Sequence, residues 1–321
     1  MISVVILDYY SCNRTIRYIE DFLSYIEING GISFVVIDNT PDKDNFLKLK
    51  GMFEDQFKLH GKSCDYNNEE LEEIIVYSSQ DLNVTLAFSV GNPGFAKGCN
   101  IGAKISRDIY RANRILFSNN DIIFEDVNVI AKLNLSLDEN SDVFCTGPNV
   151  IGSDGLRQSP HRKIGIWGKW IIPFGCFPLT SMAIRLNSGL VSKFSDIIEK
   201  NENGKVYRII GAFMLVDTDK FFEVGMFDIR TFLYGEEPIL AERALKYGYH
   251  CYYVHDTKII HEQNLCVDKE YNVKAKTGLK LNTDINVYYR EYLKVPRPVL
   301  FLAKIAFELF FFLKPKYCKN K

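Results

Sequence analysis

Short apolar runs alternate with amphipathic segments over the first 120 residues of the chain. The runs are rich in β-branched residues, as buried parallel strands are, and they lie at 3–8, 32–38, 84–89 and 114–118. Apolar residues at helical spacing predict helices at about 13–27 and 96–110, and the charged segment 42–73 is expected to contain another. Strand–helix alternation of this kind predicts a parallel sheet with helices on both faces.

The pattern changes after residue 140. Apolar runs predict strands at 143–151, 206–217 and 249–254, and a helix is expected at 236–248. Residues 266–321 have the pattern of a mostly helical extension. These assignments predict one α/β domain over 1–265, followed by a C-terminal helical extension over 266–321.

Composition narrows the class of protein. The chain has 321 residues, 47% of them hydrophobic, which suffices for a substantial core. Its net charge of −1 gives no overall attraction to nucleic acid. The eight cysteines form no C-x-x-C pair, and the first residues lack the pattern of a signal peptide. A cytoplasmic protein with reduced thiols is therefore expected.

One segment near the C-terminus is unusually apolar. VLFLAKIAFELFFFL, at 299–313, is interrupted only by Lys304 and Glu308, which are four residues apart and so share a helical face. It is too short and too charged to predict a membrane-spanning helix, and a lysine-rich tail follows it. The pattern suits a helix on the anionic, cytoplasmic face of a membrane, and equally a helix packed on the domain or on a partner subunit. Peripheral membrane contact and a homodimer are both left open.

Polar side chains follow several of the predicted strands. Asp8, Asp38, Asn92 and Asp121 fall at or just past strand ends. In open parallel sheets, ligands bind beyond the carboxyl ends of the strands. The sequence therefore predicts a ligand site at this edge of the sheet.

The glycine-rich stretch GNPGFAKGCNIG, at 91–102, follows a strand and opens a helix. Its glycine spacing fits neither the G-x-G-x-x-G dinucleotide pattern nor a P-loop, which argues against a nicotinamide enzyme. Gly94 would still let the backbone approach a ligand, and Lys97 would neutralise phosphate. A tight turn whose glycines solve a packing problem explains the stretch equally well.

This stretch resembles the N-x-G-[FY]-[AG]-x-[GA]-x-N-x-G pattern of family 2 glycosyltransferases, particularly the bacterial rhamnosyltransferase-like members. Segments similar to other motifs of that family occur in the same order, namely SVVILDYYS, FVVIDNTP, ILFSNNDIIF and GAFMLVDTDKFFEVGMFDIRTFLYGEE. The order and spacing agree over about residues 2–262. The resemblance implies a GT-A fold with a mixed, mostly parallel sheet, a nucleotide-sugar donor and an inverting transfer.

The resemblance also implies a set of donor-binding residues. Asp38 would accept the imide N–H of the nucleobase in a charge-assisted hydrogen bond, and this contact is favoured over the alternative of a simple turn at Asp-Asn-Thr-Pro. The implied nucleotide-sugar contacts are Tyr9, Asp38, Asn92, Gly94, Phe95, Lys97, Asn100, Asn119 and Asn120.

The polar triplet in LFSNND interrupts an apolar run, and its last residue is the obvious ligand for a cation. A divalent Mg²⁺ or Mn²⁺ ion would neutralise the diphosphate leaving group through Asp121. Asn119 holds the first place of the family's D-x-D-like triplet, so a single anionic ligand remains. His261 is the second metal candidate, although a lone histidine is more often structural.

Two acids open the helix predicted at 236–248. Pro238 would take the first helical position, which places Glu237 at the N-cap and Glu236 before it. Register with the family pattern makes Glu237 the catalytic base and lets Glu236 orient sugar hydroxyls. The assignment between the two stays open, and so does simple capping of the helix dipole.

The expected function is therefore inverting transfer of a sugar from a UDP-, dTDP- or GDP-linked donor to a saccharide or polyprenyl-linked acceptor, in bacterial surface polysaccharide synthesis. The alternative is a catalytically inactive relative that binds nucleotide-sugar or serves as a scaffold, since the Asn-Asn-Asp and Glu-Glu-Pro sequences depart from the family pattern. Trp167 and Trp170 lie in the variable acceptor-side segment, where they would stack on sugars, sit at a lipid boundary or pack in an ordinary loop.

Overall fold

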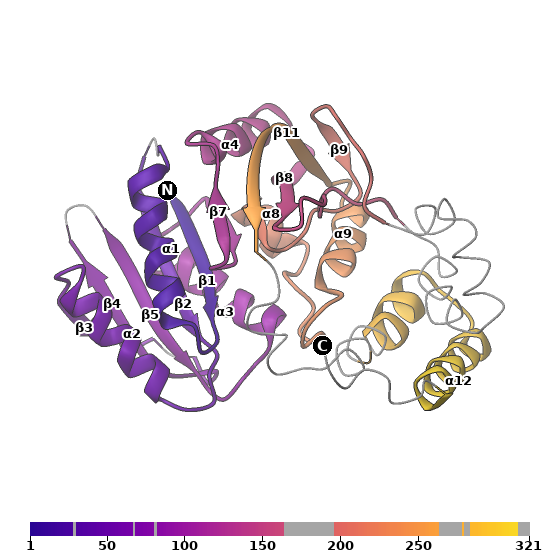
Figure 1. Cartoon of the computed structure of the whole chain (residues 1–321), viewed down its shortest axis with the longest axis horizontal. Coiled ribbons are helices and arrows are strands. Elements are labelled where there is room, and N and C mark those ends of the chain that lie inside the picture. Colours follow the sequence, from indigo (N-terminus) through magenta and orange to yellow (C-terminus); the bar gives the residue numbers. More distant parts are fainter. Residues whose placement is uncertain are drawn as a thin grey trace.

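The computed structural model describes residues 1–27, 30–66, 68–79, 82–163, 196–262, 278 and 283–313. In this part of the chain eleven strands form a single sheet in the order β3-β4-β5-β2-β1-β6-β10-β8-β11-β7, with β9 pairing to β11 (Figure 1). The strands are β1 Ile2–Asp8, β2 Ile32–Asp38, β3 Gly61–Ser63, β4 Leu71–Ser78, β5 Asn83–Ser89, β6 Arg114–Ser118, β7 Ile122–Phe124, β8 Val143–Gly152, β9 Gly204–Val206, β10 Phe213–Asp217 and β11 His250–His261.

The four N-terminal strands predicted from apolar runs, β1, β2, β5 and β6, are confirmed as a parallel block. In this block β1 and β2 pair without a shift from Ile2↔Ile32 to Asp8↔Asp38. The two aspartates therefore end adjacent strands at the same edge. The antiparallel strand β10 extends the block from β6 toward β8.

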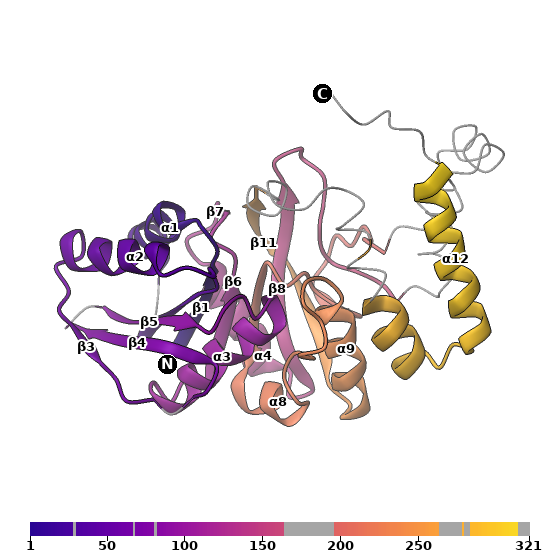
Figure 2. The same cartoon turned by 90° about the horizontal axis from the view of Figure 1, so that it is seen from below.

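Helices cover both faces of the sheet, as the alternating pattern predicts. The helices α1 (Cys12–Tyr25), α2 (Asp44–Asp55) and α4 (Val129–Glu139) pack on one face, where Phe22, Phe46 and Leu133 share a core cluster. The helices α3 (Phe95–Asp108), α8 (Thr218–Glu223) and α9 (Glu236–Lys246) pack on the other, where Ile101, Phe221 and Leu240 share a second cluster. Figure 2 shows α1 and α2 opposite α3 and α8. Both faces of the parallel strands are thus buried, which explains their continuous apolar runs.

One predicted strand is wrong, and one charged segment contains more than the expected helix. Residues 206–217 are not one strand, because β9 pairs with β11 while β10 pairs with β6 and β8, and the chain crosses between them over 207–212. The charged segment 42–73 contains the expected helix α2, but it also contains β3 and the start of β4. These strands form an antiparallel hairpin at the edge of the sheet, where polar residues face solvent.

The start of α9 also differs from the prediction. The helix begins at Glu236, and Gly235, with φ of +94°, occupies the N-cap. Pro238 is therefore the third helical residue rather than the first. It is tolerated there because the first four N–H groups of a helix have no partner within the helix.

The C-terminal extension is helical where it is described. It consists of the π-helix η1 (Asp284–Tyr292) and the helix α12 (Arg297–Leu313). A small core cluster joins it to α9 through Ile239, Tyr288, Tyr289 and Leu300. Figures 1 and 2 both place α12 at the end of the molecule far from β3 and β4. Among the described helices, none has the length and apolar character needed to cross a membrane.

Candidate functional site

The carboxylate that ends β1 is fully engaged in local structure. Asp8 is buried, and its oxygens accept hydrogen bonds from the Ser11 N–H (3.1 Å), the Ser11 hydroxyl (3.1 Å) and the Asn45 amide (2.8 Å). The Thr15 hydroxyl also donates to it. Because these donors come from the start of α1 and from α2, Asp8 fixes both helices against the end of β1.

The carboxylate that ends β2 is engaged on one side only. Oδ1 of Asp38 accepts the Thr40 N–H at 3.0 Å and the Thr40 hydroxyl at 2.8 Å. Oδ2 is buried without a hydrogen-bond partner among the described residues. Burial raises the pKa of Asp38 to about 6, although the Thr40 groups and the nearby Asn45 amide lower it. The turn expected from the sequence is therefore present, and one oxygen is left over.

Tyr9 follows Asp8 at the same edge. It is half-buried, and its ring lies edge-on to Tyr10 with 4.9 Å between the centroids. Tyr10 adopts a positive φ of 51°, and its hydroxyl donates to Asp42. The chain turns sharply here, directly after the end of β1.

The glycine-rich turn has a packing role that the structure makes explicit. Gly94 has φ of +81°, and a Cβ there would lie 2.4 Å from the Phe232 carbonyl oxygen. That carbonyl accepts the Phe95 N–H at 2.7 Å, and the Asn92 side chain accepts the Gly94 N–H at 3.0 Å. The start of α3 is thereby fixed against the segment that leads to α9. Lys97 is paired with Glu70 at 3.1 Å.

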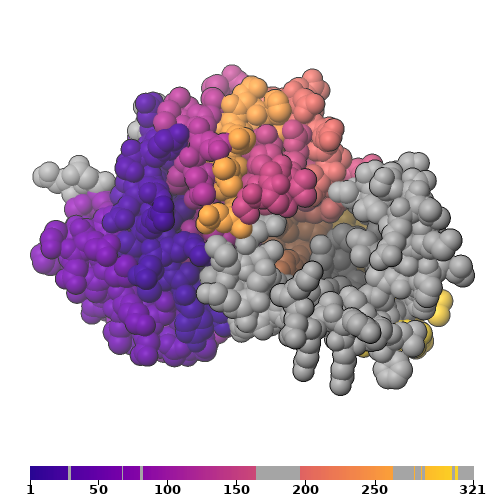
Figure 3. Space-filling model, viewed as in Figure 1, coloured from indigo at the N-terminus to yellow at the C-terminus, as the bar shows by residue number. Residues whose placement is uncertain are grey.

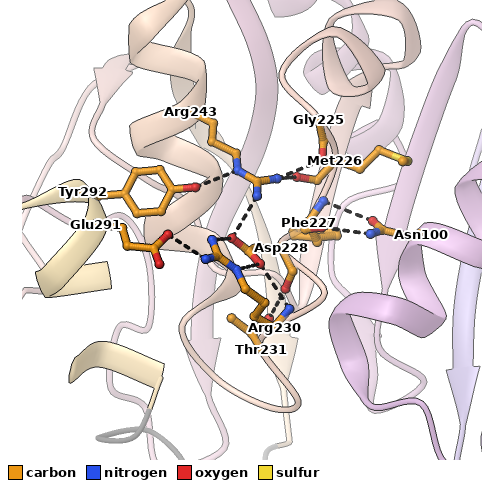
Figure 4. A network of polar contacts seen from close by, with 10 residues as sticks. All are labelled: Asn100, Gly225, Met226, Phe227, Asp228, Arg230, Thr231, Arg243, Glu291 and Tyr292. Carbon is orange, nitrogen blue, oxygen red and sulfur yellow. Dashed lines mark hydrogen bonds and ion pairs between the residues drawn. The ribbon is translucent and has the colours of Figure 1, made fainter. Parts of the chain in front are cut away.

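Asn100 is directed away from the sheet edge. Its amide donates to the Phe227 carbonyl at 2.9 Å, and its oxygen accepts the Phe227 N–H at 3.1 Å (Figure 4). Only 4% of the residue is exposed. The structure therefore gives Asn100 the role of clamping the 225–231 loop onto α3 through both ends of its amide.

The polar triplet after β6 lies between two parts of the molecule. The Asn120 amide donates to the hydroxyls of Ser11 and Thr15, both at 2.8 Å, and so reaches the residues that surround Asp8. The Asn119 N–H donates to the Ala212 carbonyl at 2.9 Å, and its amide lies 3.2 Å from Nε2 of His261. These contacts explain why polar residues interrupt the apolar run.

Asp121 and His261 face each other across 3.3 Å, from Asp121 Oδ1 to His261 Nε2, and both side chains are about nine-tenths buried. The histidine ends β11, which pairs antiparallel to β7 with His261 opposite Ile122. In Figure 3 the orange residues of β11 lie at the surface between the purple N-terminal half and magenta residues near 150. The sheet thus brings together two metal candidates that are 140 positions apart in the chain.

Gln158 determines which ring nitrogen of His261 is available. Its oxygen lies 2.7 Å from Nδ1, and its amide donates to the His261 carbonyl at 3.5 Å. An Nδ1–H donated to Gln158 leaves the Nε2 lone pair directed at Asp121 and Asn119. Histidine ligands of metals are held in this way by a second residue that accepts the other ring N–H.

This donor set fits a divalent cation. Asp121 supplies a carboxylate oxygen, and His261 supplies an imidazole nitrogen fixed in the tautomer that a ligand needs. No group of three or more His, Cys, Asp or Glu side chains within the described ranges is arranged to hold a metal. A cation at this pair would take its remaining ligands from water or a bound anion.

The two glutamates at the start of α9 differ in exposure. Glu236 is buried, and its Oε2 has no hydrogen-bond partner among the described residues. Burial, and then the negative charge of Glu237, raise the pKa of Glu236 above that of an ordinary carboxyl group. Glu237 is half-buried, and its Oε1 accepts the Gly211 N–H at 3.0 Å. Glu237 is thus held through one of its two carboxylate oxygens.

A buried ion pair lies beside these glutamates. Arg208 donates to Asp196 at 2.6 Å, and His161 lies 3.7 Å from the same carboxylate. Burial alone would lower the pKa of Arg208, but the negative charges of Glu237 and Asp196 raise it overall. The acidic α9 start therefore faces a fixed positive charge on the chain segment that joins β9 to β10.

A second network holds the loop that precedes the glutamates (Figure 4). Asp228, which is 2% exposed, accepts from the side chains of Arg230 (2.8 Å) and Arg243 (2.8 Å). Arg230 also bonds Glu291 at 2.6 Å, and Arg243 bonds the Tyr292 hydroxyl at 2.9 Å. The loop, α9 and the C-terminal extension are tied together at this point.

Strand pairing, hydrogen bonds and adjacency in the chain connect the predicted site residues. Asp38 lies beside Asp8 in register, and Asn120 bonds the hydroxyls around Asp8. Within the same triplet, Asn119 bonds Ala212, whose neighbour Gly211 bonds Glu237. The base candidate, the metal candidates and the nucleotide candidate therefore share one sheet edge.

Several contributors escape sequence reasoning. Gln158, Asp196 and Arg208 belong to no motif, and a lone glutamine or arginine carries no spacing signal. The sequence also does not predict the network around Asp228, although Asp228 lies in the segment 211–237 that resembles a family motif. Trp167 and Trp170 lie outside the described residues.

No known protein family matches the sequence, and no curated protein matches it either. Solved structures do resemble it. GalNAc-T7 with UDP, GalNAc and Mn²⁺ superposes with a TM-score of 0.56 at 15% identity, over 98% of this chain and 56% of that one. The mannosyltransferase PcManGT from Pyrobaculum calidifontis, in complex with GDP-Man and Mn²⁺, gives 0.54 at 10% identity, over 100% of this chain and 76% of that one.

A third structure, residues 1–349 of S. aureus TarS in complex with UDP-GlcNAc, gives a TM-score of 0.52 at 10% identity, over 99% of this chain and 74% of that one. This chain thus spans little more than half the length of GalNAc-T7. The likenesses confirm the expected fold, a GT-A fold with a mostly parallel central sheet flanked by helices.

Proposed function

We propose that this GT-A chain transfers a sugar from a nucleotide-diphosphate donor to an acceptor hydroxyl with the help of a divalent cation. The observation that carries the proposal is the facing pair Asp121–His261, oriented by Gln158, on the sheet edge that also holds Glu237. A cation ligand pair and a held carboxylate on one sheet edge are what metal-assisted group transfer requires.

Asp38 is the proposed contact to the nucleobase. Its unpartnered oxygen would accept an imide or amide N–H of uracil, thymine or guanine, which compensates the burial of the carboxylate. Tyr9 stands beside it. Asn92, Gly94, Phe95 and Lys97 at the start of α3, with Asn119 and Asn120, border the same edge and are retained as donor contacts. Asn100 is not retained, because both ends of its amide bind Phe227.

Asp121 and His261 would hold the cation, which supplies charge neutralisation for the departing diphosphate. Mg²⁺ prefers oxygen ligands, so a site with one imidazole nitrogen favours Mn²⁺. Two of the similar structures are complexes with Mn²⁺, and three are complexes with UDP or with UDP- or GDP-linked sugars. These complexes support the choice of donor class and metal.

Glu237 is the proposed base. Oε2 of Glu237 takes the proton of the acceptor hydroxyl. At the same time, the hydroxyl oxygen forms a bond to the anomeric carbon of the donor sugar. The bond from this carbon to the diphosphate breaks on the opposite face, and the diphosphate leaves with the electron pair, so the configuration is inverted. The Gly211 N–H fixes the carboxylate through its other oxygen. Glu236 is the poorer base, because its buried carboxyl favours the neutral form.

The proposed identity of the acceptor rests on the motif resemblance alone. A saccharide or polyprenyl-linked saccharide in bacterial surface polysaccharide synthesis is the proposed acceptor class, and rhamnosyl or hexosyl transfer the proposed reaction. We also propose residue 265 as the boundary between the GT-A domain and the C-terminal helical extension. The extension packs against α9 of the domain.

The test is an activity assay with a panel of UDP-, dTDP- and GDP-sugars and Mn²⁺. The released nucleoside diphosphate (UDP, dTDP or GDP) is measured for wild type and for Glu237→Gln. Loss of the base should lower turnover by about 10²–10⁴-fold while donor binding persists. Glu223→Gln, on α8 and bonded only to Tyr249, is the matched control and should be unaffected. Donor binding without turnover in wild type, with any acceptor extract, would favour the inactive scaffold instead.

A further inference from the structure

Helix α12 has two apolar faces, and only one of them is covered. Leu300 and Ala303 are 4% and 5% exposed and pack with the cluster on η1 and α9. Phe301 and Leu302 are 65% and 64% exposed. Ile305 and Leu309 are 40% and 46% exposed.

The exposed side chains form one continuous stripe. Phe301, Ile305 and Leu309 are four residues apart and lie above one another, and Leu302 lies beside them. At 3.6 residues per turn, this stripe is centred opposite the face that holds Leu300 and Ala303. The inner face therefore attaches the helix to the protein, and the outer face is presented outward. Scattered exposed leucines need no explanation, but a contiguous stripe of this kind marks an interaction surface.

The charge around the helix indicates what covers the stripe. From Lys294 to the end of the chain there are seven basic residues and one acidic residue, Glu308, whereas the whole chain has a net charge of −1. In the described part, Lys294, Arg297 and Lys304 are exposed. An excess of positive charge next to an apolar stripe complements a surface that is anionic at its headgroups and apolar beneath them.

Other occupants fit less well. Nucleic acid would satisfy the basic residues but would leave the phenylalanine and leucine side chains in water. A second copy of the chain would cover the apolar stripe but would bring the same excess of positive charge, which it does not neutralise. A lipid surface satisfies both features at once.

We propose that α12 docks this protein on a membrane surface containing anionic lipid, with Phe301, Leu302, Ile305 and Leu309 entering the headgroup boundary. The basic residues around the helix contact the lipid headgroups. The helix lies in the plane of the surface, since its inner face stays attached to η1 and α9. This inference stands independently of the transfer reaction.

The experiment is sedimentation of the full-length protein with vesicles. Vesicles of equal parts phosphatidylglycerol and phosphatidylcholine should carry the protein down, and vesicles of phosphatidylcholine alone should carry down several-fold less. Raising the salt concentration should weaken binding to the anionic vesicles. Phe301→Gln with Leu302→Gln should lower the partition about tenfold or more, because two large apolar side chains no longer enter the lipid.

Leu156→Gln is the matched control, because Leu156 is 67% exposed, the same as Leu302 within a few per cent, but lies on the turn after β8. It should bind like wild type. Lys304→Glu tests the charge separately and should weaken binding to anionic vesicles while leaving the apolar stripe intact.

Three results would overturn the inference. One is wild-type protein that stays in the supernatant with anionic vesicles. Another is a Phe301/Leu302 variant that sediments as wild type does. The third is light scattering that shows a dimer which this variant converts to monomer, because the stripe would then be a protein interface. Nucleotide binding, measured on the same samples, reports on the proposed function independently of all three.

Discussion

The ends of β1 and β2 carry chemically identical groups in opposite situations. Asp8 and Asp38 are paired in register, and both are fully buried. Asp8 is surrounded by hydrogen-bond donors from two helices, whereas Asp38 has one oxygen occupied by Thr40 and one without a partner in the part of the chain that the structure describes. Burial raises the pKa of Asp38 to about 6.

The difference separates a carboxylate that holds local structure from the one that we propose as a ligand contact. A buried charge is tolerated when donors surround it, and it is costly when they do not. At the carboxyl ends of the parallel strands, Asp38 keeps a buried oxygen without a hydrogen-bond donor from the described part of the chain. This oxygen can accept a hydrogen bond from a ligand. The incomplete set of partners, rather than the identity of the residue, is what supports Asp38 as the proposed ligand contact.

The same contrast recurs at the other end of the site. Asp228 is enclosed by Arg230 and Arg243, whereas Glu236, eight residues later, has an oxygen without a partner among the described residues. A fully paired acid and an incompletely paired acid thus occur close together in both halves of the molecule.

Removal of the charge at Asp228 should have the largest effect on stability. Asp228→Asn leaves Arg230 and Arg243 without their shared carboxylate, and the free energy of unfolding should fall by about 3 kcal/mol. Burial would raise the pKa of Asp228, but the arginines lower it overall. Its contribution is therefore present above the unfolded pKa and lost as pH falls through the folded one. Urea unfolding at neutral and acid pH measures the difference, which should shrink in acid.

Asn substitutions at the two strand ends compare them directly. Asp8→Asn replaces an acceptor surrounded by donors with a group that carries its own donor, and should cost about 2 kcal/mol of unfolding free energy. Asp38→Asn should be at least as stable as wild type at neutral pH, because it removes a charge that is buried with too few partners. If both variants lost the same free energy of unfolding in urea, the two carboxylates would contribute equally to stability.

Gln158 offers a test of the metal pair that leaves both ligands in place. Gln158→Ala frees the His261 ring to rotate and to change tautomer, so Mn²⁺ affinity should fall about 10–100-fold. Calorimetric titration of Mn²⁺ in the presence of UDP measures this. Gln56→Ala, at an exposed position after α2, is the control. Unchanged affinity in Gln158→Ala would show that His261 does not need Gln158 to bind the ion.

The smallest expected effect is a pH dependence. Because the pKa of Asp38 is raised to about 6, nucleotide affinity should increase about tenfold as pH rises from one unit below that value to well above it. The stability linkage has the opposite sense. The neutral carboxyl favours the fold below the unfolded pKa, and this contribution is lost as pH rises through 6. Fluorescence titrations of wild type and Asp38→Asn should differ in slope, and identical pH profiles would exclude Asp38 from the nucleotide contact.

Sequence patterns predict the parallel block well, because strands buried on both faces must be apolar throughout, as β1 and β2 are. They miss the β3–β4 edge hairpin, where solvent-facing residues make the strands look like charged loop. The start of α9 was misplaced because Pro238 suggests a first helical position, while the positive φ of Gly235 fixes the cap two residues earlier.

Within the site, residues in ordered motifs are identifiable, and residues that act on them from elsewhere are not. The sequence predicts Asp38, Asp121, Glu237 and His261 as candidates, and the sheet brings them to one edge. Two features of the site depend on pairings between strands that are distant in the sequence. One is the oxygen of Asp38 that lacks a partner among the described residues, and the other is the orientation of His261 by Gln158. No spacing rule reports such pairings.

If this sheet edge binds a nucleotide-sugar and Asp38 contacts its base, the nucleotide alone should bind and should depend on that carboxylate. Calorimetric titration of UDP, dTDP and GDP with Mn²⁺ into wild type and Asp38→Asn measures both. At least one of these nucleotides should bind wild type, and the substitution should weaken its binding tenfold or more without loss of stability. Equal affinity for both proteins, or no binding of any of the three to wild type, would show that Asp38 does not bind a nucleobase at this edge.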